Sequence, residues 1–176
     1  MRDHPRDRIV SRLRLLTLRR GWLRARQRVV FTNGVFDILH RGHIELLDRA
    51  KSAGDILIVG LNSDASVRRQ KGSSRPINRQ RDRAMVLASL RPVDYVCIFS
   101  SNTPLDLIKA LRPNVLVKGA EYKSGQIVGS GEVRSWGGVV LRFPMKRGYS
   151  SSRSIRAGQI RKRRRYKPGI APQHAD

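Results

Sequence analysis

The chain has 176 residues, of which 37 are Lys or Arg and 13 are Asp or Glu, for a formal net charge of +24. This length fits one domain with short extensions, and a hydrophobic content of 39% is enough for a modest core. The single cysteine, Cys97, excludes an internal disulfide framework and a cysteine-rich zinc site. No apolar run is long enough to cross a bilayer, and the arginine-rich start lacks the apolar segment of a signal peptide, so we expect a cytoplasmic protein.

The charge is concentrated at the two ends of the chain. Residues 1–27 contain nine Arg and two Asp, and residues 158–176 contain six basic residues and one Asp. A run of cations such as residues 161–165 can bind nucleic acid by counterion release, but it is also typical of a solvated end. We therefore expect a basic helical extension at 1–27, a domain at 28–157 and a basic, mobile tail at 158–176, with nucleic-acid binding that is at most weak and non-specific.

The predicted elements begin with an amphipathic helix. Ile9, Leu13 and Leu16 have helical spacing, which predicts a helix over residues 8–20 that ends near Gly21 and packs on the domain. Short apolar runs then predict five strands, at residues 29–32, 56–61, 93–99, 115–117 and 139–141. Helices are predicted at residues 44–50, 64–69, 82–90, 103–111 and 150–161, the fourth with Thr103 as N-cap and Pro104 in the first turn.

Strands that alternate with helices and are apolar throughout predict a parallel sheet with both faces covered. The expected fold class is therefore α/β, a single Rossmann-like domain with a five-stranded parallel sheet. Ligands of such folds bind at the carboxyl ends of the strands, where the strand order reverses. The polar motifs that follow the strands are thus the candidate site.

The first of these motifs lies between the first strand and the next helix. His40 and His43, three residues apart at the start of a helix, can point in one direction, and Gly42 lets a phosphate approach the backbone. The helix N-terminus adds free N–H groups and the positive end of the helix dipole. This combination suits a polyphosphate, whose oxygens the histidines can stabilise during group transfer. The alternative is a pair of surface histidines in a turn.

Three further motifs occupy comparable places. Asn62 and Asp64 follow the second strand as possible phosphate contacts or ordinary helix caps, ahead of a glycine-containing stretch rich in Lys and Arg. Lys118, after the fourth strand, can reach a nucleotide phosphate or snorkel to solvent. Hydroxyl groups at residues 149–152 precede the last helix, where they can bind an anion or cap the helix. In combination, the motifs indicate a nucleotide site.

The motifs also resemble a known family, the D-glycero-β-D-manno-heptose 1-phosphate adenylyltransferases, within the nucleotidyltransferase superfamily that carries the H-x-G-H signature. The similar stretches are residues 31–40 (Phe-Thr-Asn-Gly-x-Phe-Asp-Ile-Leu-His), 60–64, 67–72, 75–78, 82–83, 111–119, 127–129 and 148–150. The resemblance covers residues 28–157 and fits the stand-alone form; the activity also occurs as the C-terminal half of a bifunctional kinase–adenylyltransferase. Val35 replaces a usual Cys, and Arg147 a usual Glu.

The resemblance implies adenylyl transfer from ATP, with Mg²⁺, to a heptose 1-phosphate, giving ADP-heptose, a lipopolysaccharide core precursor, and pyrophosphate. ATP and a sugar 1-phosphate would be the ligands of a homodimer, and no protein side chain is expected to bind metal. The implied catalytic residues are His40, His43, Lys71 and Arg83. The implied nucleotide-binding residues are Thr32, Asn33, Gly34, Phe36, Asp37, Gly42, Asn62, Asp64, Lys118, Gly119, Tyr149, Ser150, Ser151 and Ser152. Arg75 and Glu121 are the implied contacts of the sugar phosphate.

Two other functions stay open on the sequence. One is a CTP-dependent cytidylyltransferase that acts on a polyol or amino-alcohol phosphate. The other is a nucleic-acid-binding protein that works through its basic ends. The complete set of motifs argues against a catalytically inactive scaffold.

Overall fold

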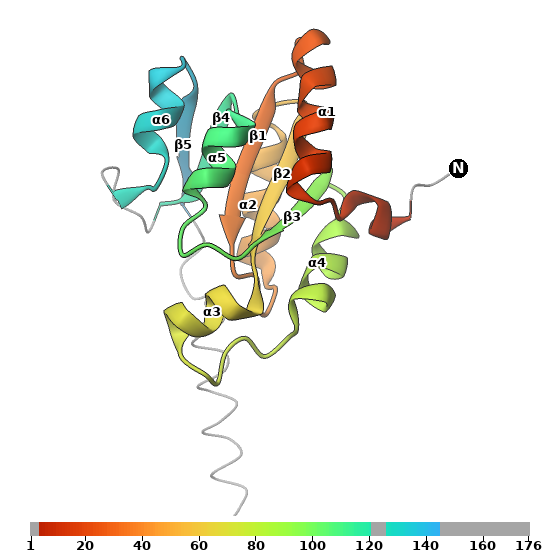
Figure 1. Cartoon of the computed structure of the whole chain (residues 1–176), viewed down its shortest axis with the longest axis vertical. Coiled ribbons are helices and arrows are strands. Elements are labelled where there is room, and N and C mark those ends of the chain that lie inside the picture. Colours follow the sequence, from red (N-terminus) through yellow and green to blue (C-terminus); the bar gives the residue numbers. More distant parts are fainter. Residues whose placement is uncertain (1–3, 121–125, 145–176) are drawn as a thin grey trace, which may run out of the picture.

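Five parallel strands form a single sheet in the order β3-β2-β1-β4-β5, in a computed structural model that describes residues 4–120 and 126–144 (Figure 1). The strands are β1 (Val29–Gly34), β2 (Ile56–Asn62), β3 (Tyr95–Phe99), β4 (Val115–Gly119) and β5 (Val139–Phe143). The helices are the 3₁₀ turn η1 (Pro5–Arg8), α1 (Arg12–Arg24), α2 (Arg41–Lys51), α3 (Asp64–Lys71), α4 (Gln80–Ala88), α5 (Leu105–Leu111) and α6 (Ser130–Ser135).

Helices cover both faces of this sheet, as the apolar strands predicted. On one face, Leu47 of α2 and Leu87 of α4 pack on Val30 of β1. On the other face, residues of α1, α5 and α6 form a second buried cluster that includes Phe31 of β1. Neighbouring residues of β1 therefore point into opposite clusters, because side chains alternate along a strand. The predicted fold class is confirmed.

The strand order reverses beside β1. The chain runs from β1 through α2 to β2 and on to β3, and then returns through α5 to β4 on the other side of β1. The carboxyl ends of β1 and β4 therefore lie at the switch point of the sheet, where such folds bind ligands. The loops that follow β1 and β2, together with α3, lie at this end of the sheet (Figure 1).

The N-terminal helix packs on the domain, but with a different face from the predicted one. Leu15 and Trp22 are buried, and the Trp22 ring lies 5.1 Å from that of Tyr95, whereas Leu13 is 77% exposed. Burial of Trp22 with Leu15 removes more apolar surface from water than burial of Leu13 would. The helix also continues through Gly21 to Arg24, so the predicted end was wrong.

Other boundaries differ by a few residues. Pro104 is the N-cap of α5, which begins at Leu105, so Thr103 is not the cap. Helix α6 was not predicted, because its six residues are mostly polar and Val133 alone among them is buried. The predicted helix at 150–161 and the predicted mobile tail lie outside the described residues. Within the described ranges, no helix has the length and apolar character needed to cross a membrane.

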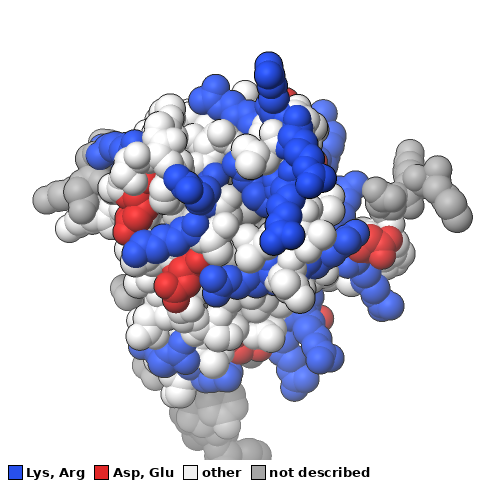
Figure 2. Space-filling view, turned by 45° about the horizontal axis from the view of Figure 1, so that its top comes forward, with Lys and Arg blue, Asp and Glu red and all other residues white. Residues whose placement is uncertain are grey.

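The surface is strongly basic. Figure 2 shows Lys and Arg side chains over much of one face, with few Asp or Glu side chains among them. Such an excess of positive charge raises the local concentration of polyanions and speeds their association at low ionic strength.

Candidate active site

The two histidines of the first motif form a stacked pair at the start of α2. His40 is the N-cap and has extended backbone angles, and the ring centroids of His40 and His43 are 3.8 Å apart. The backbone N–H of His40 donates to Nδ1 of His43 over 3.4 Å. Because Nδ1 accepts this hydrogen bond, the neutral imidazole of His43 carries its proton on Nε2. His43 therefore has an N–H that can donate to an anion.

The pKa shifts of both histidines favour the neutral imidazole at pH 7. Burial, together with the charge of Lys71 and the charge that His40 carries when protonated, lowers the pKa of His43 to about 4. Burial also lowers the pKa of His40. The pair therefore acts through hydrogen bonds rather than as two cations, and a bound phosphate would raise both pKa values, because an opposite charge favours the protonated form.

Phe36 lies in the turn between β1 and the histidine pair. Its side chain is buried, and its ring centroid lies 5.2 Å from that of His43. Its φ of 47° is in the left-handed region, which is uncommon for a bulky residue and is found at functional sites. A Cβ at Gly34 would come within 3.0 Å of the Phe36 ring, so the glycine leaves room for it. Gly34 and Phe36 thus shape the site from beneath His43.

Asp37 joins this turn to the loop between α3 and α4. Its buried carboxylate accepts hydrogen bonds from the backbone N–H groups of Ile77 and Asn78, with Oδ1 at 2.9 Å from each nitrogen. Nη2 of Arg75 lies 2.9 Å from Asp37 Oδ2. The amide of Asn78 donates in return to the backbone oxygen of Asp37 over 2.6 Å. The structure therefore brings together Asp37 and Arg75, which the resemblance had implied for the nucleotide and the sugar phosphate, and Asp37 supports the loop that carries Arg75.

Lys71 and Arg75 give the loop beside Asp37 a positive charge. Burial and the charge of Arg75 lower the pKa of Lys71, while the charge of Asp37 partly opposes the shift. Lys71 in turn contributes to the lowered pKa of His43. Lys71, Arg75 and His43 therefore share one electrostatic environment. A polyphosphate would relieve the repulsion among these groups.

Arg83, which the resemblance implied as a catalytic residue, is buried among groups of the surrounding loops. It is 2% exposed, and its guanidinium donates to the backbone oxygens of Asn78 and Val35 over 3.0 and 2.6 Å. Its Nη2 also lies 2.8 Å from Oδ1 of Asp64. These contacts make Arg83 a support for three loops at the carboxyl end of the sheet and leave it little surface for a phosphate.

Asn62 and Asp64 have structural contacts, but neither is the helix cap that the alternative predicted. Ser63 caps α3, and the amide of Asn62 donates to Oγ of Ser66 over 3.0 Å. Asp64 is bound through its carboxylate to Arg83, and its backbone N–H donates to Oε1 of Gln80. Gln80 was not predicted as part of the site, since glutamine near a helix start carries no distinctive sequence signal.

At the switch point, Lys118 of β4 meets Asn33 of β1. Nζ of Lys118 lies 2.6 Å from Oδ1 of Asn33 and 3.2 Å from its backbone oxygen. Lys118 is 8% exposed, so its ammonium group is held in place rather than snorkelling to solvent. Thr32, Gly42 and Gly119 are also buried near these strand ends and the start of α2. Glu121, Tyr149, Ser150, Ser151 and Ser152 lie outside the described residues.

The family comparison agrees with this geometry. Residues 31–157 match a family model described as cytidylyltransferase-like. The bifunctional protein HldE of Koribacter versatilis is 51% identical over 150 residues, which cover 85% of this chain and 31% of that protein. The bifunctional protein HldE of Campylobacter curvus is 63% identical over 111 residues, covering 63% of this chain and 24% of its own length. The chain thus spans less than a third of these relatives.

Solved structures show the same fold. A lipopolysaccharide core biosynthesis protein from Thermoplasma volcanium is 27% identical, with a TM-score of 0.57, and the match covers 70% of this chain and 99% of that one. The pantothenate synthetase of Thermus thermophilus has a TM-score of 0.59 at 20% identity, over 89% of this chain and 70% of its own. The second likeness concerns the fold alone.

Proposed function

Since the chain belongs to the cytidylyltransferase-like family, and is therefore a nucleotidyltransferase, we propose that it transfers the adenylyl group of ATP to D-glycero-β-D-manno-heptose 1-phosphate. An oxygen of the anomeric phosphate attacks the α-phosphorus of ATP. The bond from that phosphorus to the bridging oxygen of the β-phosphate breaks, and pyrophosphate leaves with the electron pair. The products are ADP-heptose and pyrophosphate.

The observation that carries this proposal is the stacked, neutral histidine pair beside Lys71 and Arg75 at the helix start. The attacking phosphate is already an anion at pH 7, so the reaction requires no general base. What it requires is stabilisation of the charge on the transferred group and alignment of the two substrates. Neutral imidazole N–H groups and a helix N-terminus provide hydrogen bonds, and Lys71 and Arg75 provide positive charge.

Mg²⁺ fits this scheme as a companion of ATP rather than as a metal bound by the protein. Among the described residues, no group of three His, Cys, Asp or Glu could hold a metal ion. The candidate-site carboxylates that the structure describes, Asp37 and Asp64, are already paired with arginines. Mg²⁺ usually binds substrate phosphates with few protein ligands, and there it would neutralise the leaving pyrophosphate.

The choice of a heptose phosphate rests on the relatives. The HldE proteins are bifunctional, and this chain matches about a third of each or less. The heptose 1-phosphate adenylyltransferases that the motifs resemble also occur as one half of a bifunctional protein, so the two observations support the same activity. The Thermoplasma volcanium protein, a lipopolysaccharide core biosynthesis protein, supports a role in the same biosynthesis. Support for adenine over cytosine comes from the motifs that resemble the heptose 1-phosphate adenylyltransferases, among them residues 75–78 and 111–119.

Pyrophosphate release tests this proposal. ATP and CTP are each offered with heptose 1-phosphate, glycerol 3-phosphate and phosphopantetheine, in the presence of Mg²⁺. We expect the highest kcat/KM with ATP and the heptose phosphate. A higher kcat/KM with CTP, or with either other acceptor, would move the protein to a sister activity. No pyrophosphate release with any pair would refute the proposal.

A further inference from the structure

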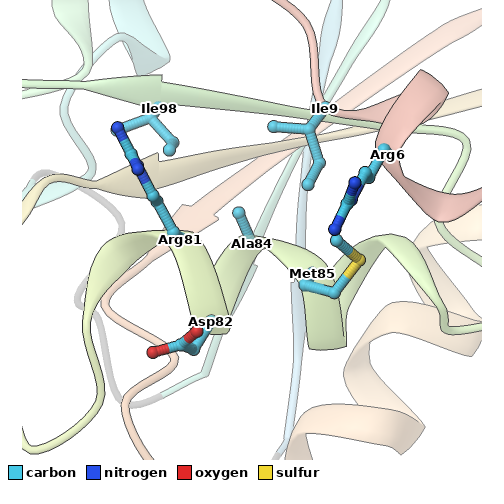
Figure 3. A pocket seen from close by; sticks show the side chains of 7 residues that line it. All are labelled: Arg6, Ile9, Arg81, Asp82, Ala84, Met85 and Ile98. Carbon is cyan, nitrogen blue, oxygen red and sulfur yellow. The ribbon is translucent and has the colours of Figure 1, made fainter.

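A cavity separate from the histidine site lies between η1 and α4, beside the edge strand β3 (Figure 3). Its volume is about 420 Å³, within the range of pockets that hold small ligands. Its lining consists of four apolar residues, Ile9, Ala84, Met85 and Ile98, which form the apolar group, and three charged residues, Arg6, Arg81 and Asp82. None of these residues has a part in the nucleotide site described above.

The apolar lining is held in place by the backbone. Ile9 forms a parallel bridge with Val96 of β3, and the N–H of Val10 donates to the Val96 oxygen over 2.9 Å. Ala84 is buried in the core below the cavity. The cavity is therefore preformed between fixed elements, and the flexible side chain of Met85 can adapt to an occupant.

The charges around this lining favour an anion. Figure 3 shows Arg6 and Arg81 on two sides of the apolar group, with the Asp82 carboxylate directed away from Ile9 and Ile98. Within the described part of the chain, neither arginine has a carboxylate within ion-pair distance. Asp82 lies in the first turn of α4, where the helix dipole stabilises its charge. An anion would thus meet two guanidinium groups without breaking an existing ion pair.

We propose that this cavity binds a small amphipathic anion, that is, a molecule with an apolar body and a phosphate, carboxylate or sulfonate group. The apolar lining disfavours a fully polar anion, because such a ligand has no apolar surface to remove from water against Ile9, Met85 and Ile98. The two guanidinium groups disfavour a cation and can bind an oxyanion through paired hydrogen bonds. A ligand in this position also joins η1 to α4 and therefore stabilises the folded chain by mass action.

The test uses hexyl phosphate as the probe. Inorganic phosphate is the control that has the charge without the apolar chain, and hexanol is the control that has the apolar chain without the charge. Binding is followed by NMR of the methyl groups of Met and Ile in the full chain. We expect hexyl phosphate to shift the signals of Ile9, Met85 and Ile98 in a saturable way and to raise Tm. Ile38 and Ile44, which flank His40 and His43, report binding at the nucleotide site instead.

Variants show whether hexyl phosphate binds in the cavity or anywhere on the basic surface. Arg6→Gln and Arg81→Gln should each weaken binding of hexyl phosphate by roughly tenfold, because each removes a charge-assisted hydrogen bond. Arg134→Gln, on exposed helix α6, makes the same change of charge elsewhere and should leave the affinity unchanged. Both cavity arginines are exposed, so these variants are expected to fold, and their melting curves confirm it.

Three results would overturn the proposal. Equal shifts with inorganic phosphate alone would show a diffuse effect of charge. Unchanged affinity in both cavity variants would show that hexyl phosphate binds elsewhere. A dimer in light scattering that Arg81→Glu dissociates would show that a second copy of the chain occupies this surface.

Discussion

The guanidinium of Arg83 donates from Nη1 to the backbone oxygen of Val35 over 2.6 Å, and so links α4 to the turn that follows β1. The next residue in that turn, Phe36, has a left-handed backbone conformation and supports the His43 ring. The same guanidinium holds Asn78 and Asp64. A buried arginine thus connects three loops that converge on the histidine pair, and its loss would disturb the site without removing a phosphate contact.

We therefore expect Arg83→Gln to lower the free energy of unfolding by about 3 kcal/mol, because it leaves a carboxylate and two carbonyl groups without their partner. Urea unfolding followed by circular dichroism measures this loss. The neighbouring exposed Arg81→Gln is the matched control and should change stability by less than about 0.5 kcal/mol. If Arg83→Gln were as stable as the wild type but had a raised KM for ATP, the residue would be a phosphate contact after all.

The histidine pair gives a prediction about rate. His40→Ala and His43→Ala should each lower kcat by roughly 10²–10³, because each removes a donor to the transferred phosphoryl group. Steady-state pyrophosphate release measures kcat, and melting curves show whether the variants fold. Near-normal kcat in both folded variants would remove the pair from the catalytic site.

The lowered pKa of His43 predicts how stability depends on pH. His43 has a pKa of about 4 in the folded chain against 6.5 in the unfolded chain, so its contribution to stability is complete above pH 6.5. That contribution decreases as the pH falls from 6.5 towards 4, since the unfolded state takes up a proton first. Urea unfolding at pH 7 and pH 5 should show a smaller pH effect in His43→Asn than in the wild type. Equal pH effects in both proteins, or an NMR titration of His43 near pH 6.5, would contradict the shift.

Asp37 gives a prediction about the support of the loop of residues 75–78. Asp37→Asn places an N–H group against Arg75 or the Ile77 N–H, which releases the loop of residues 75–78. We expect kcat/KM to fall roughly 10²-fold through misplaced cations, with a loss of stability of about 3 kcal/mol. Asp106→Asn, an exposed change of the same kind in the first turn of α5, should leave kcat/KM unchanged and lower stability by less than about 1 kcal/mol. Unchanged kcat/KM in Asp37→Asn would show that this loop does not serve the reaction.

The sequence was sufficient for the features that depend on local pattern. The strands are apolar runs bounded by polar or glycine residues, and the H-x-G-H turn follows the first of them, so both were placed to within a few residues. The role of Arg83 could not be predicted, because a motif arginine has the same sequence signal whether it binds phosphate or three buried loop groups. Helix α6 was missed for a similar reason, since one buried valine gives no periodicity.

Helix α1 shows most directly that residue spacing alone does not decide which face of a helix is buried, and two of its leucines allow this to be tested. Leu13 and Leu16 fit helical spacing, and so do Leu15 and Trp22, and only the contact with Tyr95 and the sheet decides between the two faces. Leu15→Ala should lower the free energy of unfolding by about 2–5 kcal/mol, because it opens a cavity in the core. Leu13→Ala, two residues away and 77% exposed, should change it by less than about 0.5 kcal/mol. Urea unfolding of both variants measures the difference. If Leu13→Ala were the more damaging change, α1 would pack through the face that its sequence first indicated, and the position of Trp22 against Tyr95 would be wrong.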